Sequence, residues 1–199
     1  HFLAILLQIP ANQRTTPPPT GGWSAAEIAQ HVARVEQGVV KMLGDGVHAV
    51  FDDPRDAVVA AIAVQRSLAD SAATNGVVFS VRCGLHAGVE EQRDNDFFGR
   101  AVNRAARIMG VAHGGQILLS QIVGTLVAER LPEGVGLRDL GLVRLRDLAS
   151  PERVCQVLHP TLRAEFPPLR TLEATPNNLP QQLTSFIGRE REQEEVETL

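Results

Sequence analysis

The sequence predicts an α+β fold in which helices pack on one face of a single mixed sheet. Segments of helical periodicity alternate with short β-rich runs in the order α-β-β-α-β-α-β-α-β-β. Four of the twelve prolines lie before Gly21 and five after His159, and proline-rich zones favour extended linkers. We therefore predict an irregular segment over 1–22, a folded domain over 23–159, and a proline-rich linker with the start of a following region over 160–199.

The first half of the predicted domain contains two helices and a hairpin. A capping box at Ser24 begins a helix that ends near Gln37. The β-rich runs 39–43 and 47–51 flank a Gly-Asp-Gly cluster, which is typical of a tight turn. Asp53 before a proline predicts an N-cap, and apolar residues at helical spacing continue from there to Leu68.

The second half predicts further alternation of strands and helices. Alternating residues over 77–85 predict a strand, which the polar loop 90–96 follows. A helix is expected over 99–111, then a short strand over 116–119. Ser120 is expected to cap a helix that ends near Arg130, and short strands fill 136–158.

Composition excludes several classes of protein. The net charge is −4, so no basic excess indicates a nucleic-acid or membrane-surface partner. No apolar run approaches the ~20 residues that a membrane-spanning helix needs. Cys83 and Cys155 form no C-x-x-C pair, which favours two buried thiols in a reducing cytoplasm over a metal or disulfide framework.

The first candidate site is the hairpin that contains Lys41 and Asp45. A carboxylate between two glycines can approach a hard cation such as Mg²⁺, and a lysine can donate to a base or a phosphate. A plain Gly-Asp-Gly turn explains the same residues, because this tripeptide is common turn chemistry.

The second candidate site lies on the predicted helix over 99–111. Asn103 and Arg107 are four residues apart and therefore share one helix face. An amide there can orient a sugar, and a guanidinium can stabilise phosphate charge. The alternative is a solvated polar face on which Arg107 pairs with a carboxylate.

Together these segments resemble the catalytic domain of class III adenylate/guanylate cyclases over most of 39–158. The family's K-x-x-G-D hairpin corresponds to Lys41 through Asp45, and its D-x-x-G-x-x-V-N-x-A-x-R run to Asp96 through Arg107. The resemblance implies the nucleotide cyclase fold, with a ferredoxin-like sheet, for 23–159. It also implies a head-to-tail dimer, with itself or with a related cyclase domain, and nucleotide sites at the interface.

The resemblance also implies roles for single residues. Lys41 and Asp96 would read adenine, which points to ATP as the substrate. Asn103 would position the ribose, and Arg107 would stabilise the α-phosphate during cyclisation. In the last hairpin, Arg146 would contact the terminal phosphates.

Asp45 would be a ligand of Mg²⁺ or Mn²⁺. The family places another metal-binding carboxylate on its first strand, in an F-x-D-[IV]-x-G-[SF]-T-like motif. Nothing in 1–22 matches that motif, and we expect this segment to lack the first cyclase strand.

Two functions follow from the resemblance. One is an adenylate cyclase that converts ATP to cyclic AMP and pyrophosphate in intracellular signalling. The other is a catalytically impaired module that dimerises and binds nucleotide within a bacterial transcription regulator. The tail 179–190 resembles the entry to a signal-transduction ATPase, but for this chain alone we favour a disordered linker with a helical end. Direct DNA binding finds no support.

Overall fold

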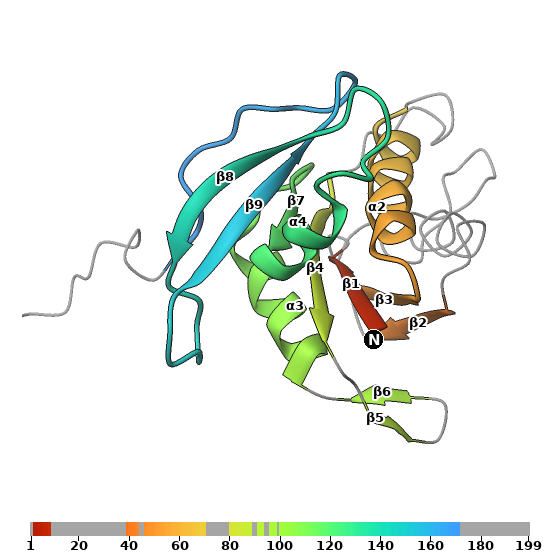
Figure 1. Ribbon diagram of the computed structural model, residues 1–199, viewed down its shortest axis with the longest axis vertical. Helices are drawn as coiled ribbons and strands as arrows, with labels where there is room; N and C mark the ends of the chain where they lie inside the picture. Colours follow the sequence, from red (N-terminus) through yellow and green to blue (C-terminus); the bar gives the residue numbers. More distant parts are fainter. Residues whose placement is uncertain are drawn as a thin grey trace, which may run out of the picture.

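The strands of the molecule form one mixed sheet and one small separate hairpin (Figure 1). The computed structural model describes residues 2–8, 39–43, 46–70, 80–88, 91–93, 96–98 and 100–171. Within these residues the main sheet has seven strands in the order β2-β3-β1-β4-β7-β9-β8. The strands are β1 (Phe2–Gln8), β2 (Val39–Leu43), β3 (Gly46–Phe51), β4 (Arg82–Gly88), β7 (Ile117–Ser120), β8 (Gly136–Val143) and β9 (Glu152–Leu158). Only β4 and β7 pair in parallel, which confirms the expected mixed α+β architecture.

The N-terminal strand lies inside the main sheet. β1 pairs antiparallel with β3 on one side and with β4 on the other. The expectation of an irregular segment over 1–22 is therefore wrong for Phe2–Gln8. This run contains no proline, so each residue can use its backbone donor and acceptor in the two ladders. The helix expected over 24–37 lies outside the described residues.

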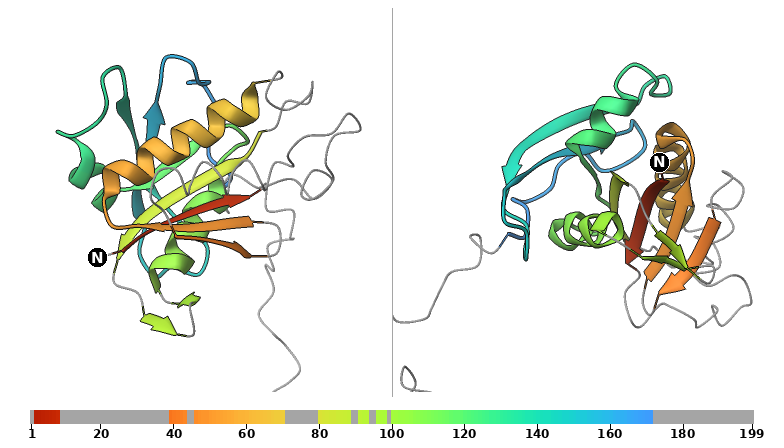
Figure 2. Two further views of the ribbon diagram at one scale, coloured as in Figure 1. Left: turned by 90° about the vertical axis from the view of Figure 1, so that its right-hand side faces the viewer. Right: turned by 60° about the horizontal axis from the view of Figure 1, so that its bottom comes forward.

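The described helices lie on two faces of the sheet (Figure 2). Helices α2 (Pro54–Ala69) and α4 (Gln121–Val127) share one buried core with alternate residues of β3 and β4. Helix α3 (Arg100–Val111) lies on the opposite face, where its residues Ile108 and Val111 pack with Leu118. Helices α2 and α4 thus pack on one face of the sheet as expected, whereas α3 packs on the other face.

Two glycines allow α3 to lie directly on β4. A Cβ added to Gly84 would stand 2.5 Å from the backbone nitrogen of Met109 and 2.6 Å from the carbonyl oxygen of Ala105. A Cβ added to Gly88 would stand 2.7 Å from Cβ of Ala101. Only glycine is compatible with such close contact between a strand and a helix.

The strand register places Lys41 on the sheet face that α3 covers. Lys41 pairs with His48, His48 pairs with Leu6, and Leu6 pairs with Gly84. Residues that pair across neighbouring strands share a face of the sheet. Since Gly84 lies under α3, the whole row belongs to that face, and three strand spacings put Lys41 roughly 14 Å from Gly84.

Several local expectations are confirmed and others differ. Asp53 caps α2 as expected and accepts a hydrogen bond from the backbone nitrogen of Arg55 at 2.8 Å. The segment expected as a polar loop over 90–96 contains a hairpin of β5 (Glu91–Arg93) and β6 (Asp96–Phe98). Its two strands pair with each other and so satisfy backbone groups that a loop would leave to water.

The first part of the expected linker packs on the domain. The backbone nitrogen of Arg170 donates to the carbonyl oxygen of Val111 at the end of α3, and Leu169 packs on the core beneath that helix. Arg138 donates to the carbonyl oxygen of Ala164 at 3.2 Å. Leu169 and Arg170 therefore cover the end of α3, whereas Ala164 contacts β8, and the linker beyond residue 171 lies outside the described residues. Among the described helices, none is long and apolar enough to cross a lipid bilayer.

We predict that Gly84→Ala destabilises the fold by about 2–3 kcal/mol, because the new methyl group meets backbone atoms that cannot rotate away. The measurement is the free energy of unfolding in urea. Gly110→Ala is the matched control. Gly110 is exposed on α3, and no atom lies within 4 Å of the added Cβ. This control should stabilise the protein by about 0.5–1 kcal/mol, and equal effects of the two changes would contradict the close contact.

Candidate functional site

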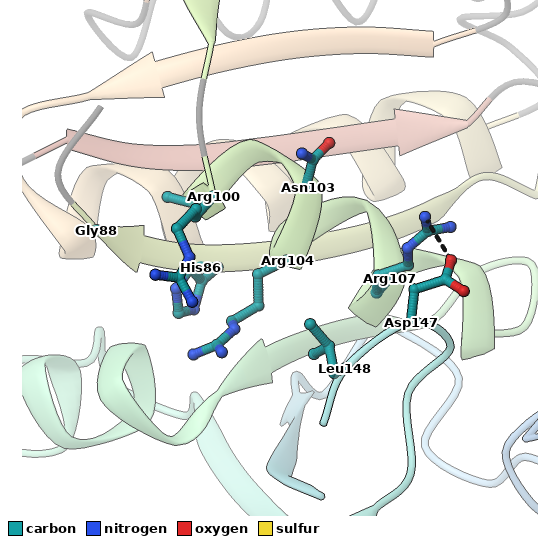
Figure 3. A pocket seen from close by; sticks show the side chains of 9 residues that line it. His86, Gly88, Arg100, Asn103, Arg104, Arg107, Asp147 and Leu148 are labelled. Carbon is teal, nitrogen blue, oxygen red and sulfur yellow. Dashed lines mark ion pairs between the residues drawn. The ribbon is translucent and has the colours of Figure 1, made fainter. Parts of the chain in front are cut away.

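Helix α3 forms one wall of an open hollow of about 510 Å³ (Figure 3). Strand β4 forms its floor, and the turn after β8 forms the facing wall. The hollow is lined by His86, Gly88, Arg100, Ala101, Asn103, Arg104, Arg107, Asp147 and Leu148. Three arginines at positions i, i+4 and i+7 share one helix face, so the hollow is rich in guanidinium donors.

Arg107 is tied to the facing wall. Its guanidinium Nη2 lies 2.8 Å from a carboxylate oxygen of Asp147, and the two side chains are 42% and 61% exposed. Asp147 has φ 59°, a left-handed conformation that aspartate adopts more readily than most residues. This turn conformation places the carboxylate opposite α3. An exposed pair of this kind contributes little to stability and can exchange partners.

Arg100 and Arg104 extend toward the side of the hollow where His86 lies (Figure 3). Arg104 lies 3.4 Å from the carboxylate of Glu152, a longer contact than that of Arg107. Arg100 is exposed and has no ion pair with any residue that the structure describes. This side of the hollow therefore has more positive than negative charge.

His86 is a buried neutral base on the floor of the hollow. The residue is 4% exposed, and its Nδ1 lies 2.9 Å from the hydroxyl oxygen of Ser120. Burial lowers the pKa of His86 to about 4, and the nearby positive charge of Arg104 acts in the same direction. Ser120 occupies the N-cap position of α4 as expected, yet its side chain makes no capping hydrogen bond and contacts His86 instead.

The structure brings together some of the residues that the sequence singled out. Asn103 and Arg107 line the same hollow. Arg146 does not line it: its side chain is 74% exposed on the turn, 3.9 Å from Asp147. Lys41 lies on the same sheet face as α3, and Asp96 begins β6 just before that helix.

Sequence reasoning missed Arg100, Arg104 and His86 as members of this site. The i, i+4, i+7 spacing of the arginines was a usable signal, because it puts them on one face with Asn103. No such spacing marks His86. Its contact with Ser120, 34 positions away, depends on the parallel pairing of β4 with β7.

The described residues do not fit a two-metal site of the kind the cyclase resemblance implies. Asp45 lies outside them, between Leu43 and Gly46, which pair with each other. Gly46 also pairs with Gln8, so β1 ends beside this turn with an amide, and β1 contains no Asp or Glu. Within the described residues no cluster of three His, Cys, Asp or Glu could hold an ion.

We predict a pH-dependent stability that originates at His86. The pKa is about 4 in the folded protein and near 6.5 when unfolded, so the unfolded chain binds the proton more readily. The contribution is complete above pH 6.5 and is lost as the pH falls toward 4. Urea unfolding should show about 2 kcal/mol less stability at pH 4.5 than at pH 7 from this group. His86→Gln should lack that component of the slope, and parallel pH profiles for variant and wild type would contradict it.

The chain was compared with known proteins. No protein-family model matches the chain. The uncharacterized protein Rv0891c of Mycobacterium tuberculosis is 42% identical over 154 residues, which is 77% of this chain and 52% of that protein. The chain thus spans about half the length of this relative. A receptor-type adenylate cyclase of Trypanosoma equiperdum is 32% identical over 83 residues, 39% of this chain and 18% of that protein.

Solved structures of cyclases share the fold. An adenylate/guanylate cyclase/hydrolase from Silicibacter pomeroyi matches with a TM-score of 0.62 and 25% identity, over 78% of this chain and 95% of that structure. The described part of the chain therefore has the fold of the class III adenylate/guanylate cyclase domains.

Proposed function

We propose that this chain is a class III adenylate cyclase domain, which converts ATP to cyclic AMP and pyrophosphate at a dimer interface. The observation that carries the proposal is the placement of Asn103 and Arg107. Both lie at the expected motif positions on one face of α3, and both line one hollow. Lys41, the candidate for base recognition, lies on the same face of the sheet.

A dimer explains how these residues would meet one nucleotide. Within one chain, two strands separate Lys41 from the strand on which α3 packs. In the head-to-tail dimer that the resemblance implies, Lys41 and Asp96 of one protomer face Asn103 and Arg107 of the other. Each interface then contains two equivalent sites, as an isologous two-fold arrangement requires.

The proposed reaction assigns each residue a separate task. Lys41 donates to a ring nitrogen of adenine, and the carboxylate of Asp96 accepts from its exocyclic amine. Asn103 holds the ribose so that the 3′-oxygen faces the α-phosphorus. The new bond joins that oxygen to the α-phosphorus, the bond from the α-phosphorus to the bridging oxygen breaks, pyrophosphate leaves with that oxygen, and the proton of the 3′-hydroxyl passes to solvent. Arg107 stabilises the negative charge that develops on the α-phosphate, and Arg146 contacts the terminal phosphates.

Arg107 has to exchange its partner to perform this task. In the free chain its guanidinium pairs with Asp147 across the hollow. Since both side chains are partly exposed, the pair costs little to break. A phosphate competes well for the guanidinium, because it can accept two parallel hydrogen bonds. Asp45 is the residue that would hold Mg²⁺ or Mn²⁺, and the cation would supply positive charge to the phosphates.

Two free thiols support the cellular setting that we propose. Cys83 is buried and free, and burial raises its pKa to about 12, so it remains protonated and unreactive. Cys155 is also free. We place the domain in a reducing cytoplasm, where the segment after residue 171 leads toward a regulatory ATPase region.

We predict that the purified chain forms cyclic AMP from ATP in the presence of Mn²⁺ and that Arg107→Ala lowers kcat about 100- to 1000-fold. The loss reflects one guanidinium that acts on the transition state. The measurement is a cyclic AMP assay under saturating ATP. Arg66→Gln, an exposed arginine at the end of α2, is the matched control and should retain full activity.

Absence of turnover in a folded chain that still binds ATP would contradict this assignment and would support the regulatory module. Equal kcat in wild type and Arg107→Ala would remove Arg107 from the reaction.

Asp45→Ala provides the parallel test of the metal ligand: it should abolish metal-dependent turnover and leave the urea unfolding curve unchanged.

We also predict that Lys41→Glu shifts the nucleotide preference from ATP toward GTP. A glutamate accepts hydrogen bonds where the lysine donates them, which suits the N–H groups on the edge of guanine. The measurement is the ratio of kcat/KM for ATP and GTP. We expect that ratio to fall by about tenfold or more, as the loss of one charge-assisted hydrogen bond requires. An unaltered ratio would show that Lys41 does not read the base.

A further inference from the structure

We propose that Arg100 and Arg104, together with His86, form a binding subsite for a polyphosphate anion beside Asn103 and Arg107. The subsite would hold the terminal phosphates of the nucleotide or the pyrophosphate that the reaction releases. This identification of the ligand rests on the proposed function. The existence of an anion site in the hollow stands on the residues described below.

The charge of the hollow favours a multivalent anion. Three guanidiniums line it, and Asp147 pairs with Arg107 alone at hydrogen-bond distance. Arg104 has one contact, at 3.4 Å, with Glu152, and Arg100 has no ion pair among the described residues. Most of the donors of these two arginines therefore remain available. Guanidiniums bind phosphate oxygens in pairs, which suits them to pyrophosphate better than to a single carboxylate.

The spacing along α3 matches a short chain of phosphates. Arg100 and Arg104 stand one helical turn apart, which separates their Cβ atoms by about 6 Å. Arg107 continues the row on the same face and reaches the opposite end of the hollow. The phosphates of a nucleotide that lie along the helix can therefore contact successive guanidiniums while the ribose stays near Asn103.

His86 adds a directional donor without adding a second buried charge. Its ring is neutral near pH 7 because of burial and the adjacent Arg104. When the hydroxyl of Ser120 donates to Nδ1, the proton of the imidazole resides on Nε2. Nε2 lies 3.8 Å from the position that a Cβ on Gly88 would occupy. That position is next to Ala101, in the first turn of α3. In that tautomer Nε2 carries the proton that would be donated to the anion.

Arg146 does not account for anion binding inside this hollow. Its side chain is 74% exposed and lies outside the lining. It can contact a bound nucleotide from the solvent side of the turn. The donors that face the interior are those of Arg100 and Arg104, in addition to Arg107.

The test is titration of the purified full chain with inorganic pyrophosphate by calorimetry at pH 7.5 and low salt. We expect Arg100→Gln and Arg104→Gln each to weaken pyrophosphate binding about tenfold, as the loss of one charge-assisted contact predicts. Arg100→Gln is the sharper variant, because this exposed side chain has no partner to leave unpaired in the described fold. Arg66→Gln is the matched control for loss of one positive charge and should bind as wild type.

A second readout reports on His86 directly. Its imidazole NMR signals, assigned by their loss in His86→Gln, should shift when pyrophosphate is added to wild type. Wild-type affinity in both arginine variants, or no measurable pyrophosphate binding at millimolar concentration, would overturn the proposal. Unmoved His86 signals at saturation would remove His86 from the subsite.

The same variants separate the two sources of the anion and separate this proposal from the proposed function. Equal weakening of ATP and pyrophosphate binding identifies the terminal phosphates of the nucleotide, whereas weakening of pyrophosphate binding alone identifies the released product. A chain that binds pyrophosphate through Arg100 but makes no cyclic AMP keeps the subsite and rejects the cyclase. A chain that makes cyclic AMP but binds pyrophosphate equally well in all variants keeps the cyclase and rejects the subsite.

Discussion

The candidate site depends on the close contact between α3 and β4. Gly84 and Gly88 lie on one face of the strand, and no side chain could stand at either position without meeting the helix. His86 lies between them in the strand and on the same face, and it is 4% exposed. The sequence pattern Gly-x-His-x-Gly therefore allows the short distance between α3 and β4, and it supplies the floor of the hollow.

The opposite wall of the hollow packs against the C-terminal end of α3. Leu148 and Leu169 both pack on the core that Ile108 and Val111 of α3 help to form, and Arg170 hydrogen-bonds the last residue of the helix. The turn that carries Asp147 and the C-terminal segment thus contact one common element. A displacement of α3 changes both walls together, because packed cores transmit strain and deform little. Leu169 and Arg170 thus contact the helix that carries Asn103 and Arg107, the residues proposed for the reaction.

Local sequence signals predicted the helices better than the sheet. The Asp-Pro cap and the helical spacing gave α2, and the Asn103-to-Arg107 spacing gave the face of α3 that lines the hollow. β1 was assigned to an irregular segment, because the prolines after it dominated the interpretation of 1–22. That Lys41 shares a face with α3 follows only from a row of pairs across four strands. Such a row depends on long-range register, which no short window of sequence contains.

The distribution of charge connects the fold to the proposed chemistry. A nucleoside triphosphate brings several negative charges to its site, and these have to be neutralised before the α-phosphorus can be attacked. β1 contains no carboxylate to share a cation with Asp45, whereas the face of α3 contains three arginines. Because α3 cannot move off its strand, the backbone positions of these arginines are fixed, and only their side chains have to reorient, Arg107 by leaving Asp147. Under the proposed function, neutralisation of phosphate in the described part of this chain would fall to the arginine row, which the two glycines of β4 hold in place.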